Sequence, residues 1–154
     1  MEKKTLKRIF EFLEEKENHN VPFLWKHING EPLTEKDLNI EGNLNLEALD
    51  IESLPNGLKV NGSAYFTFLN IKSIPDGFEV SRSLFLDSTD IESLPEGLKV
   101  GRHLYLQGSY VTSLPKGLEV GENLYIRDLD LEKYSDEELR EMIKPGFIKG
   151  KIIR

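Results

Sequence analysis

Hydrophobic residues recur along most of the chain with a step of 20 residues. The segments IESLPNGLKV, IKSIPDGFEV, IESLPEGLKV and VTSLPKGLEV begin at Ile51, Ile71, Ile91 and Val111, with no insertion or deletion between them. A unit of this length cannot bury its apolar side chains alone, so the copies must stack on one another. The pattern therefore predicts a solenoid over residues 38–132.

Inside each unit, apolar residues fall into columns that repeat from copy to copy. From Leu58 to Phe66, apolar and polar residues alternate with the period of two that is typical of a strand with one buried face. We therefore expect each coil to add at least one strand to a parallel sheet. On the return side, a proline followed two residues later by a glycine favours a turn. The columns expected to point inward are Leu44, Ala64, Leu84, Leu104 and Leu124; Leu46, Phe66, Leu86, Leu106 and Ile126; Ile51, Ile71, Ile91, Val111 and Leu131; Leu54, Ile74, Leu94 and Leu114; Leu58, Phe78, Leu98 and Leu118; and Val60, Val80, Val100 and Val120.

The two ends of the chain lack the repeat, and we expect them to cover the open ends of the solenoid as α-helical caps. In the N-terminal cap, residues 1–37, apolar residues recur at helical spacing within residues 4–17. An aromatic segment, residues 21–25, follows and precedes the first coil. The side chains expected to be largely buried on that coil are Leu6, Phe10, Leu13 and Trp25.

In the C-terminal cap, residues 133–154, Ser135 and Glu138 have the spacing of a capping box. This spacing predicts a helix that starts there and ends before Pro145. The alternating tail, residues 147–154, is expected to form a closing strand. The predicted fold class is a β-rich solenoid, a parallel sheet of stacked coils with helical caps at both ends, and the whole chain forms one structural domain.

The unit LxLxxxxIxSLPxGLxV resembles the short bacterial type of leucine-rich repeat, and the resemblance covers residues 38–132. The pattern is also similar to that of leucine-rich proteins from bacteria and their tailed phages. The family usually carries asparagine or cysteine in a column that here reads Leu49, Leu69, Thr89, Ser109 and Leu129. We expect serine hydroxyls on the return side to satisfy backbone groups in its place. These serines are Ser53, Ser73, Ser93 and Ser113. Both a curved horseshoe and a straighter β-solenoid are compatible with this pattern.

Charge and composition narrow the kinds of partner. The chain has 27 Asp and Glu residues against 20 Lys and Arg residues, a formal net charge of -7, which argues against non-specific binding to nucleic acid or anionic lipid. Cysteine is absent, so disulfides and thiolate metal sites are excluded. The sequence shows no pattern of a signal peptide and no apolar run of transmembrane length. We expect a soluble cytoplasmic protein of a bacterium, or one encoded by a phage.

Few residues have the arrangement that catalysis or metal binding requires. His19, His27 and His103 are far apart and are expected at the surface, and no common catalytic or phosphate-binding motif is present. We therefore expect no enzymatic activity and no cofactor. Acidic residues recur at the coil turns, but Lys72 and Thr112 interrupt them and the calcium-binding β-solenoid repeat is absent, so no metal site is expected. A ladder of alternating charge between coils is predicted for Lys59, Glu79, Lys99 and Glu119.

One outward column is aromatic. A residue between two inward apolar residues must point out of the sheet, and this column reads Asn45, Tyr65, Phe85, Tyr105 and Tyr125. The aromatic row could serve only to stabilise the strands, or it could form an interface, because aromatic side chains are favoured at binding hot spots. The residues that rim this face are Asp87, Gln107 and Arg127, and those that could extend it are Phe68 and Tyr110.

From these features we expect a non-enzymatic module that binds another protein through the exposed sheet face. A first alternative is an acidic inhibitor or nucleic-acid mimic that blocks a basic groove of a target protein. In that case the binding residues would be the carboxylates of the coil turns, Asp50, Glu52, Asp90, Glu92, Asp130 and Glu132. A second alternative is a structural or assembly role. Direct contact with nucleic acid or with a membrane is not expected.

Overall fold

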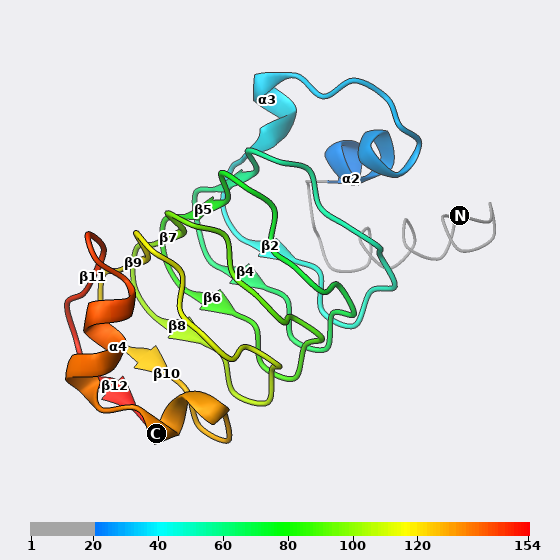
Figure 1. Ribbon diagram of the computed structural model, residues 1–154. Helices are drawn as coiled ribbons and strands as arrows, with labels where there is room; N and C mark the ends of the chain where they lie inside the picture. Colours follow the sequence, from blue (N-terminus) through cyan, green and yellow to red (C-terminus); the bar gives the residue numbers. More distant parts are fainter. Residues whose placement is uncertain (1–20) are drawn as a thin grey trace.

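The computed structural model describes residues 21–154, which form a parallel β-solenoid of about four coils (Figure 1). Each coil contributes two short strands, and equivalent strands of successive coils pair in parallel with a register of 20 residues, as in Leu84 with Leu104. The predicted stacking of coils is therefore confirmed. One sheet consists of β1 (Asn39–Ile40), β3 (Lys59–Val60), β5 (Glu79–Val80), β7 (Lys99–Val100), β9 (Glu119–Val120) and β11 (Phe147–Ile148). The other consists of β2 (Leu44–Asn45), β4 (Ala64–Tyr65), β6 (Leu84–Phe85), β8 (Leu104–Tyr105), β10 (Leu124–Tyr125) and β12 (Ile152–Ile153).

The structure divides the alternating segment from Leu58 to Phe66 into two strands in different sheets, β3 and β4. The bend between them lies at residues 61–63. Buried and exposed side chains alternate within each strand, and Phe66 is as fully buried as Leu58. The period of two therefore predicted the buried side correctly, but it could not show where the chain turns from one sheet to the next.

The inward columns meet in one continuous hydrophobic core. The leucines at the start of β6 and β8, Leu84 and Leu104, have no exposed surface, and neither does Leu124 in β10. The return side of each coil, which follows the second sheet, contains turns but no extended strand among the described coils, and one isolated bridge joins Ser73 to Ser93 there. The turns predicted there are confirmed, since Gly57 and Gly117 have φ angles of 78° and 76°, which glycine adopts without steric cost.

Two short helices precede the first coil, α2 (Val21–Ile28) and α3 (Glu35–Leu38). The helix predicted over residues 4–17, with Leu6, Phe10 and Leu13, lies outside the described residues. Phe23 and Leu24 of α2 are buried in the core, whereas Trp25 is 39% exposed, so the prediction of a largely buried Trp25 is wrong. The reason is helical geometry: each residue is rotated by about 100° from the one before it, so three consecutive side chains cannot all face the coil.

At the other end, the 3₁₀ helix η1 (Asp130–Lys133) leads into α4 (Asp136–Met142). The predicted capping box is present, with Ser135 accepting from the backbone N–H of Glu138 and the Glu138 carboxylate accepting from that of Ser135. The tail, expected as one closing strand, instead forms β11 and β12, one for each sheet. Arg140 of α4 donates to the backbone carbonyls of Ile148 and Gly150, which lie in and beside these last strands. Within residues 21–154, no helix has the length and apolar character needed to cross a bilayer.

Candidate binding surface

The outward column of the second sheet forms a continuous stack of aromatic rings, here called the aromatic ladder. Its members are Tyr65, Phe85, Tyr105 and Tyr125. Successive ring centroids lie 4.9, 4.6 and 4.4 Å apart, with interplanar angles of 7°, 8° and 10°. The parallel register of the strands produces this arrangement, because it places each ring directly beside the ring of the next coil.

The stacking determines which parts of the rings reach solvent. Phe85 and Tyr105 each have a stacked ring on both faces, so they present mainly their edges outward. The two ends of the ladder lie beside Asn45 and Ile153, the strand partners of Tyr65 and Tyr125. All four aromatic side chains are half-buried. The surface therefore offers a rigid row of ring edges and tyrosine hydroxyls.

The predicted rim residues come two positions after the ladder residues, at the start of the turns that follow β6, β8 and β10. Asp87 and Gln107 are half-buried, whereas Arg127 is exposed and lies 4.0 Å from the Asp128 carboxylate. Burial raises the pKa of Asp87 above its usual value. Burial also raises the pKa of the Tyr105 hydroxyl, with a further contribution from Tyr125, so this hydroxyl is neutral at physiological pH. The structure thus places the four predicted aromatic residues in one stack on the sheet face and the three rim residues at the turns beside it.

A second ladder, which sequence reasoning missed, runs beside the aromatic one. Its members, here called the polar ladder, are Asn43, Ser63, Ser83, His103 and Asn123. Each side chain accepts a hydrogen bond from the backbone N–H of the equivalent residue in the next coil, at 2.8, 3.3, 3.4 and 3.2 Å along the first four steps. The last member, Asn123, accepts from Lys151 at 2.9 Å. The signal in the sequence was a column in which every residue can accept a hydrogen bond, two positions before the aromatic column.

The polar ladder pairs backbone groups between coils, a role that the sequence had assigned to the serines of the return side. Ser53, Ser73, Ser93 and Ser113 are exposed, so the expectation that their hydroxyls replace the missing asparagines is wrong. The Ser53 hydroxyl instead contacts the His27 ring nitrogen at 3.1 Å. At the bend between the two sheets, some backbone groups pair directly with the next coil, as in the Ser81 N–H with the Val60 carbonyl. The backbone N–H of each following ladder residue is paired by a side chain of the preceding coil instead. A side chain at this bend can reach them, whereas the serines lie on the return side.

His103 is part of this ladder and not merely a solvated surface residue as expected. Its Nδ1 atom accepts from the Asn123 backbone, and its Nε2 atom lies 2.8 Å from a carboxylate oxygen of Glu122. The ring also meets the edge of the Tyr125 ring at a centroid distance of 5.8 Å. This geometry requires a proton on Nε2 and none on Nδ1. His19 lies outside the described residues.

The outward column of the first sheet has a different chemistry, as the alternating charges predicted. The carboxylate of Glu79 lies 3.8 Å from the Lys59 amine and 3.7 Å from the Lys99 amine. Together with Glu119, these three side chains are here called the charged ladder. The exposed fractions of the Lys59, Glu79 and Lys99 side chains lie between about two-fifths and just over half. Exposed pairs of this kind contribute about 0–1 kcal/mol each.

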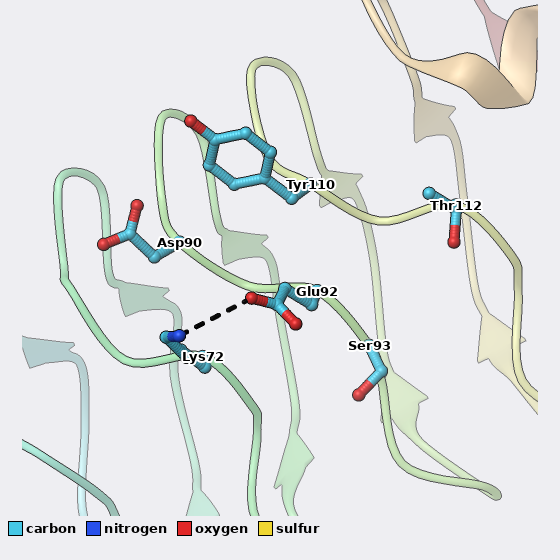
Figure 2. A pocket seen from close by; sticks show the side chains of 6 residues that line it. All are labelled: Lys72, Asp90, Glu92, Ser93, Tyr110 and Thr112. Carbon is cyan, nitrogen blue, oxygen red and sulfur yellow. Dashed lines mark ion pairs between the residues drawn. The ribbon is translucent and has the colours of Figure 1, made fainter.

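The six carboxylates of the acidic alternative are exposed at the coil turns: Asp50, Glu52, Asp90, Glu92, Asp130 and Glu132. Some have partners within the chain. Asp50 accepts from the Asn70 amide at 2.8 Å, Glu92 lies 3.8 Å from the Lys72 amine, and Glu132 accepts from the Asp128 backbone at 2.6 Å. Figure 2 shows an open groove whose lining residues come from three successive coils: Lys72, Asp90, Glu92, Ser93, Tyr110 and Thr112. In the part of the chain that the structure describes, no three acidic or histidine side chains gather as metal ligands would.

In comparisons with known proteins, no family model, no curated protein and no solved structure matches this chain. Its function therefore has to be inferred from the chemistry of its own surfaces.

Proposed function

We propose that this protein is a protein-binding module that uses the aromatic ladder and its rim as the contact surface. The observation that carries the proposal is the stack of four outward rings at 4.4–4.9 Å on one sheet face. Aromatic side chains supply a large share of the energy at protein interfaces. The partner is another protein, and no cofactor takes part.

Preorganisation makes this surface suitable for binding. Each ring of the ladder is held by its neighbours, and the polar ladder ties the adjacent bend from coil to coil. A partner therefore meets side chains that have already lost most of their freedom, so the entropy cost of binding them is small. Asp87, Gln107 and Arg127 add polar groups at the border, where interfaces usually place them.

The alternative is that the aromatic ladder only stabilises the strands. The first sheet argues against this, because it has the same register and strand length but carries the charged ladder in its outward column. An aromatic column is therefore not needed to hold this type of sheet together. A stabilising contribution of about 0.5–1 kcal/mol per stacked pair is compatible with a binding role.

The proposal extends to the type of fold and the location. We place the chain with short leucine-rich-repeat solenoids, in the cytoplasm of a bacterium or encoded by its phage. The terminal segments serve as caps: Phe23 and Leu24 of α2 bury apolar surface at one end, and Leu139 of α4 with Ile143 does so at the other. This role is expected for the ends of any solenoid, since they would otherwise expose an apolar coil.

The exposed carboxylates of the coil turns favour the second candidate function, an acidic inhibitor that occupies a basic groove of its target. The two candidates differ in their response to salt. Binding through the aromatic ladder should persist at high ionic strength, whereas binding through exposed carboxylates should weaken steeply. A purely structural role would show no specific partner in either condition.

Paired variants test the proposal. Proteins of the source cells are captured with the wild-type chain, with Phe85→Ala/Tyr105→Ala, and with Glu79→Ala/Lys99→Ala, which removes two outward side chains from the other sheet. The partner should be lost only with the aromatic variant. Titration calorimetry with the purified partner should then show a loss of about 2 kcal/mol or more, roughly thirty-fold in affinity.

Circular dichroism spectra of the variants establish that both remain folded. If Phe85→Ala/Tyr105→Ala binds as tightly as the wild type while Asp90→Lys/Glu92→Lys loses the partner, the aromatic surface is not the binding site. The acidic inhibitor would then replace it as the proposed function.

A further inference from the structure

The acidic character of this protein is concentrated on one edge of the solenoid. The turns that follow the second sheet, residues 47–52, 67–72, 87–92, 107–112 and 127–132, lie side by side and are here called the turn edge (Figure 1). They contain nine carboxylates and two cationic residues, Lys72 and Arg127. The whole chain has 27 acidic and 20 basic residues, so the turn edge accounts for the entire net charge of -7. An uneven distribution of this kind attracts a basic partner to one edge of the molecule.

The groove in the turn edge has a volume of about 760 Å³ and combines an aromatic wall with carboxylates. Tyr110 extends from its own turn towards the neighbouring turn, which carries Asp90 and Glu92 (Figure 2). The backbone N–H of Tyr110 donates to the Ile91 carbonyl at 2.9 Å, which holds the base of the side chain against that turn. Tyr110 is nevertheless 66% exposed. Its ring is therefore not needed for the core, and much of its surface is open to a ligand.

The charges of the groove are available to a ligand. Within residues 21–154, the Asp90 carboxylate has no hydrogen-bond or ion-pair partner. Glu92 has one, the Lys72 amine at 3.8 Å, with side-chain exposures of 63% and 78% for Glu92 and Lys72. A long and exposed pair of this kind is weak, so a cation that arrives with better geometry can displace it.

We propose that this groove binds an arginine side chain from a basic, extended segment of the partner protein, an inference that rests on the proposed function as a protein-binding module. A guanidinium group is planar and can stack on the Tyr110 ring while it donates hydrogen bonds to the carboxylates of Asp90 and Glu92. Lysine carries the same charge but lacks the planar fork, so arginine fits this combination better.

A second exposed aromatic residue on the turn edge supplies an apolar contact for the same segment. Phe68 is 66% exposed and has a φ angle of 59°, a conformation that is uncommon for a bulky residue. It lies two coils from Tyr110, which is about 10 Å along the solenoid axis. An extended segment therefore reaches both residues within a few amino acids.

The experiment follows the amide signals of the full ¹⁵N-labelled chain by NMR during titration with a short N-terminally acetylated peptide. In this peptide arginine and glycine alternate, and one glycine is replaced by leucine. A matched peptide carries citrulline, which has the shape of arginine without its charge. We expect the arginine peptide to shift the amide signals of residues 88–93 and 108–112, with a Kd of about a millimolar, and the citrulline peptide to leave them unchanged. Equal binding of both peptides would overturn the proposal, and so would shifts confined to the aromatic ladder.

Charge-matched variants show whether the groove itself is responsible. Asp90→Asn/Glu92→Gln should weaken peptide binding about five-fold or more, because both ligand carboxylates are removed. The control, Asp76→Asn/Glu96→Gln, removes the same charge from exposed positions at the Pro-x-Gly turns of two successive coils and should change the Kd less than about two-fold. An equal effect of the two variants would mean that the peptide responds only to net charge, and the groove would be rejected.

Two single variants sharpen the test. Lys72→Gln should strengthen binding about two-fold, because it removes the cation that competes for Glu92. Tyr110→Phe should retain binding while Tyr110→Leu loses most of it, because stacking needs a ring but no hydroxyl. Weaker binding in Lys72→Gln, or equal binding in the two Tyr110 variants, would contradict the proposed geometry.

The test of the arginine site can be distinguished from the test of the proposed function, because one variant should affect partner binding but not peptide binding. Phe85→Ala/Tyr105→Ala should leave peptide binding unchanged, since the aromatic ladder does not line the groove. If this variant abolishes peptide shifts, the arginine site lies on the sheet face and the groove proposal is wrong. If it releases the protein partner but not the peptide, both proposals stand.

Discussion

The two sheets of this solenoid have the same backbone plan and opposite surface chemistry. Both consist of six parallel strands of two residues with a 20-residue register, and both turn one side chain per strand into the common core. The outward column of one sheet is the charged ladder, whereas that of the other is the aromatic ladder. The comparison shows that the fold constrains the inward side chains strongly and the outward ones only weakly, so the outward columns are free to carry function.

The core side chains should contribute more to the free energy of unfolding than the outward side chains of either sheet. Leu104→Ala creates a cavity at a position with no exposed surface and should lower the free energy of unfolding by about 2–5 kcal/mol. Tyr105→Ala, the next residue along the same strand, removes a larger side chain but should cost about 1 kcal/mol, because that side chain points outward. Urea denaturation followed by circular dichroism measures both. Equal losses would mean that the inward and outward sides are not energetically distinct.

The outward side chains of the two sheets should also differ in how much they contribute to the free energy of unfolding. Phe85→Ala/Tyr105→Ala removes three stacked pairs and should cost about 1–2 kcal/mol. Glu79→Ala/Lys99→Ala removes two exposed ion pairs and should cost about 0.5 kcal/mol or less, with an even smaller effect in high salt. Denaturation at low and high salt provides the measurement. A larger cost for the charged pair would reverse the comparison.

The polar ladder offers a test of the bend that joins the two sheets. His103→Leu leaves the Asn123 backbone N–H without its acceptor and should cost about 1 kcal/mol. His103→Asn restores an acceptor of the kind that Asn43 and Asn123 already provide and should recover most of this loss. Hydrogen exchange of the Asn123 amide should be faster in the leucine variant only. Similar exchange in both variants would show that the hydrogen bond has no energetic role.

The smallest expected effect concerns the rim of the aromatic ladder. Burial raises the pKa of Asp87 from its ordinary value of 3.8, so the folded state binds its proton more tightly than the unfolded state does. This residue therefore reduces stability as the pH rises from about 4 through its raised pKa, and the penalty is fully present above that pKa. Asp87→Asn should be slightly more stable than the wild type at pH 7, and the gain should vanish below pH 4. Thermal unfolding across this range would contradict the prediction if the gain were independent of pH.

Much of the core could be predicted because each coil repeats the same contacts. A leucine at position 84 has leucine at 104 as its partner, so a single 20-residue period determines the neighbours of almost every buried side chain. The capping box at Ser135 was predictable for a similar reason, since it involves residues close in sequence. The outward direction of the aromatic column followed from the strand period alone.

Other features depended on how separate segments meet. Trp25 was expected inside, but the helical rotation of α2 leaves it partly exposed while Phe23 and Leu24 fill the core. The polar ladder escaped prediction because its members share no residue type, only the ability to accept a hydrogen bond from the next coil. The groove at Tyr110 needs the turn of the preceding coil as its second wall, which no single unit of the sequence contains.

The sequence by itself therefore determined the repeat, the identity of the inward columns and the chemistry available on the outward ones, because all three follow from periodicity. The tertiary structure decided that each coil contributes to two sheets and bends at residues 61–63 and their equivalents. It also decided that the rings of the aromatic ladder stack within 4.9 Å and that two carboxylates of the turn edge, Asp90 and Glu92, line a groove with Tyr110. The physical reason is that alternation records which side of the chain is buried, whereas bends, ring stacking and grooves depend on distances between residues of different coils.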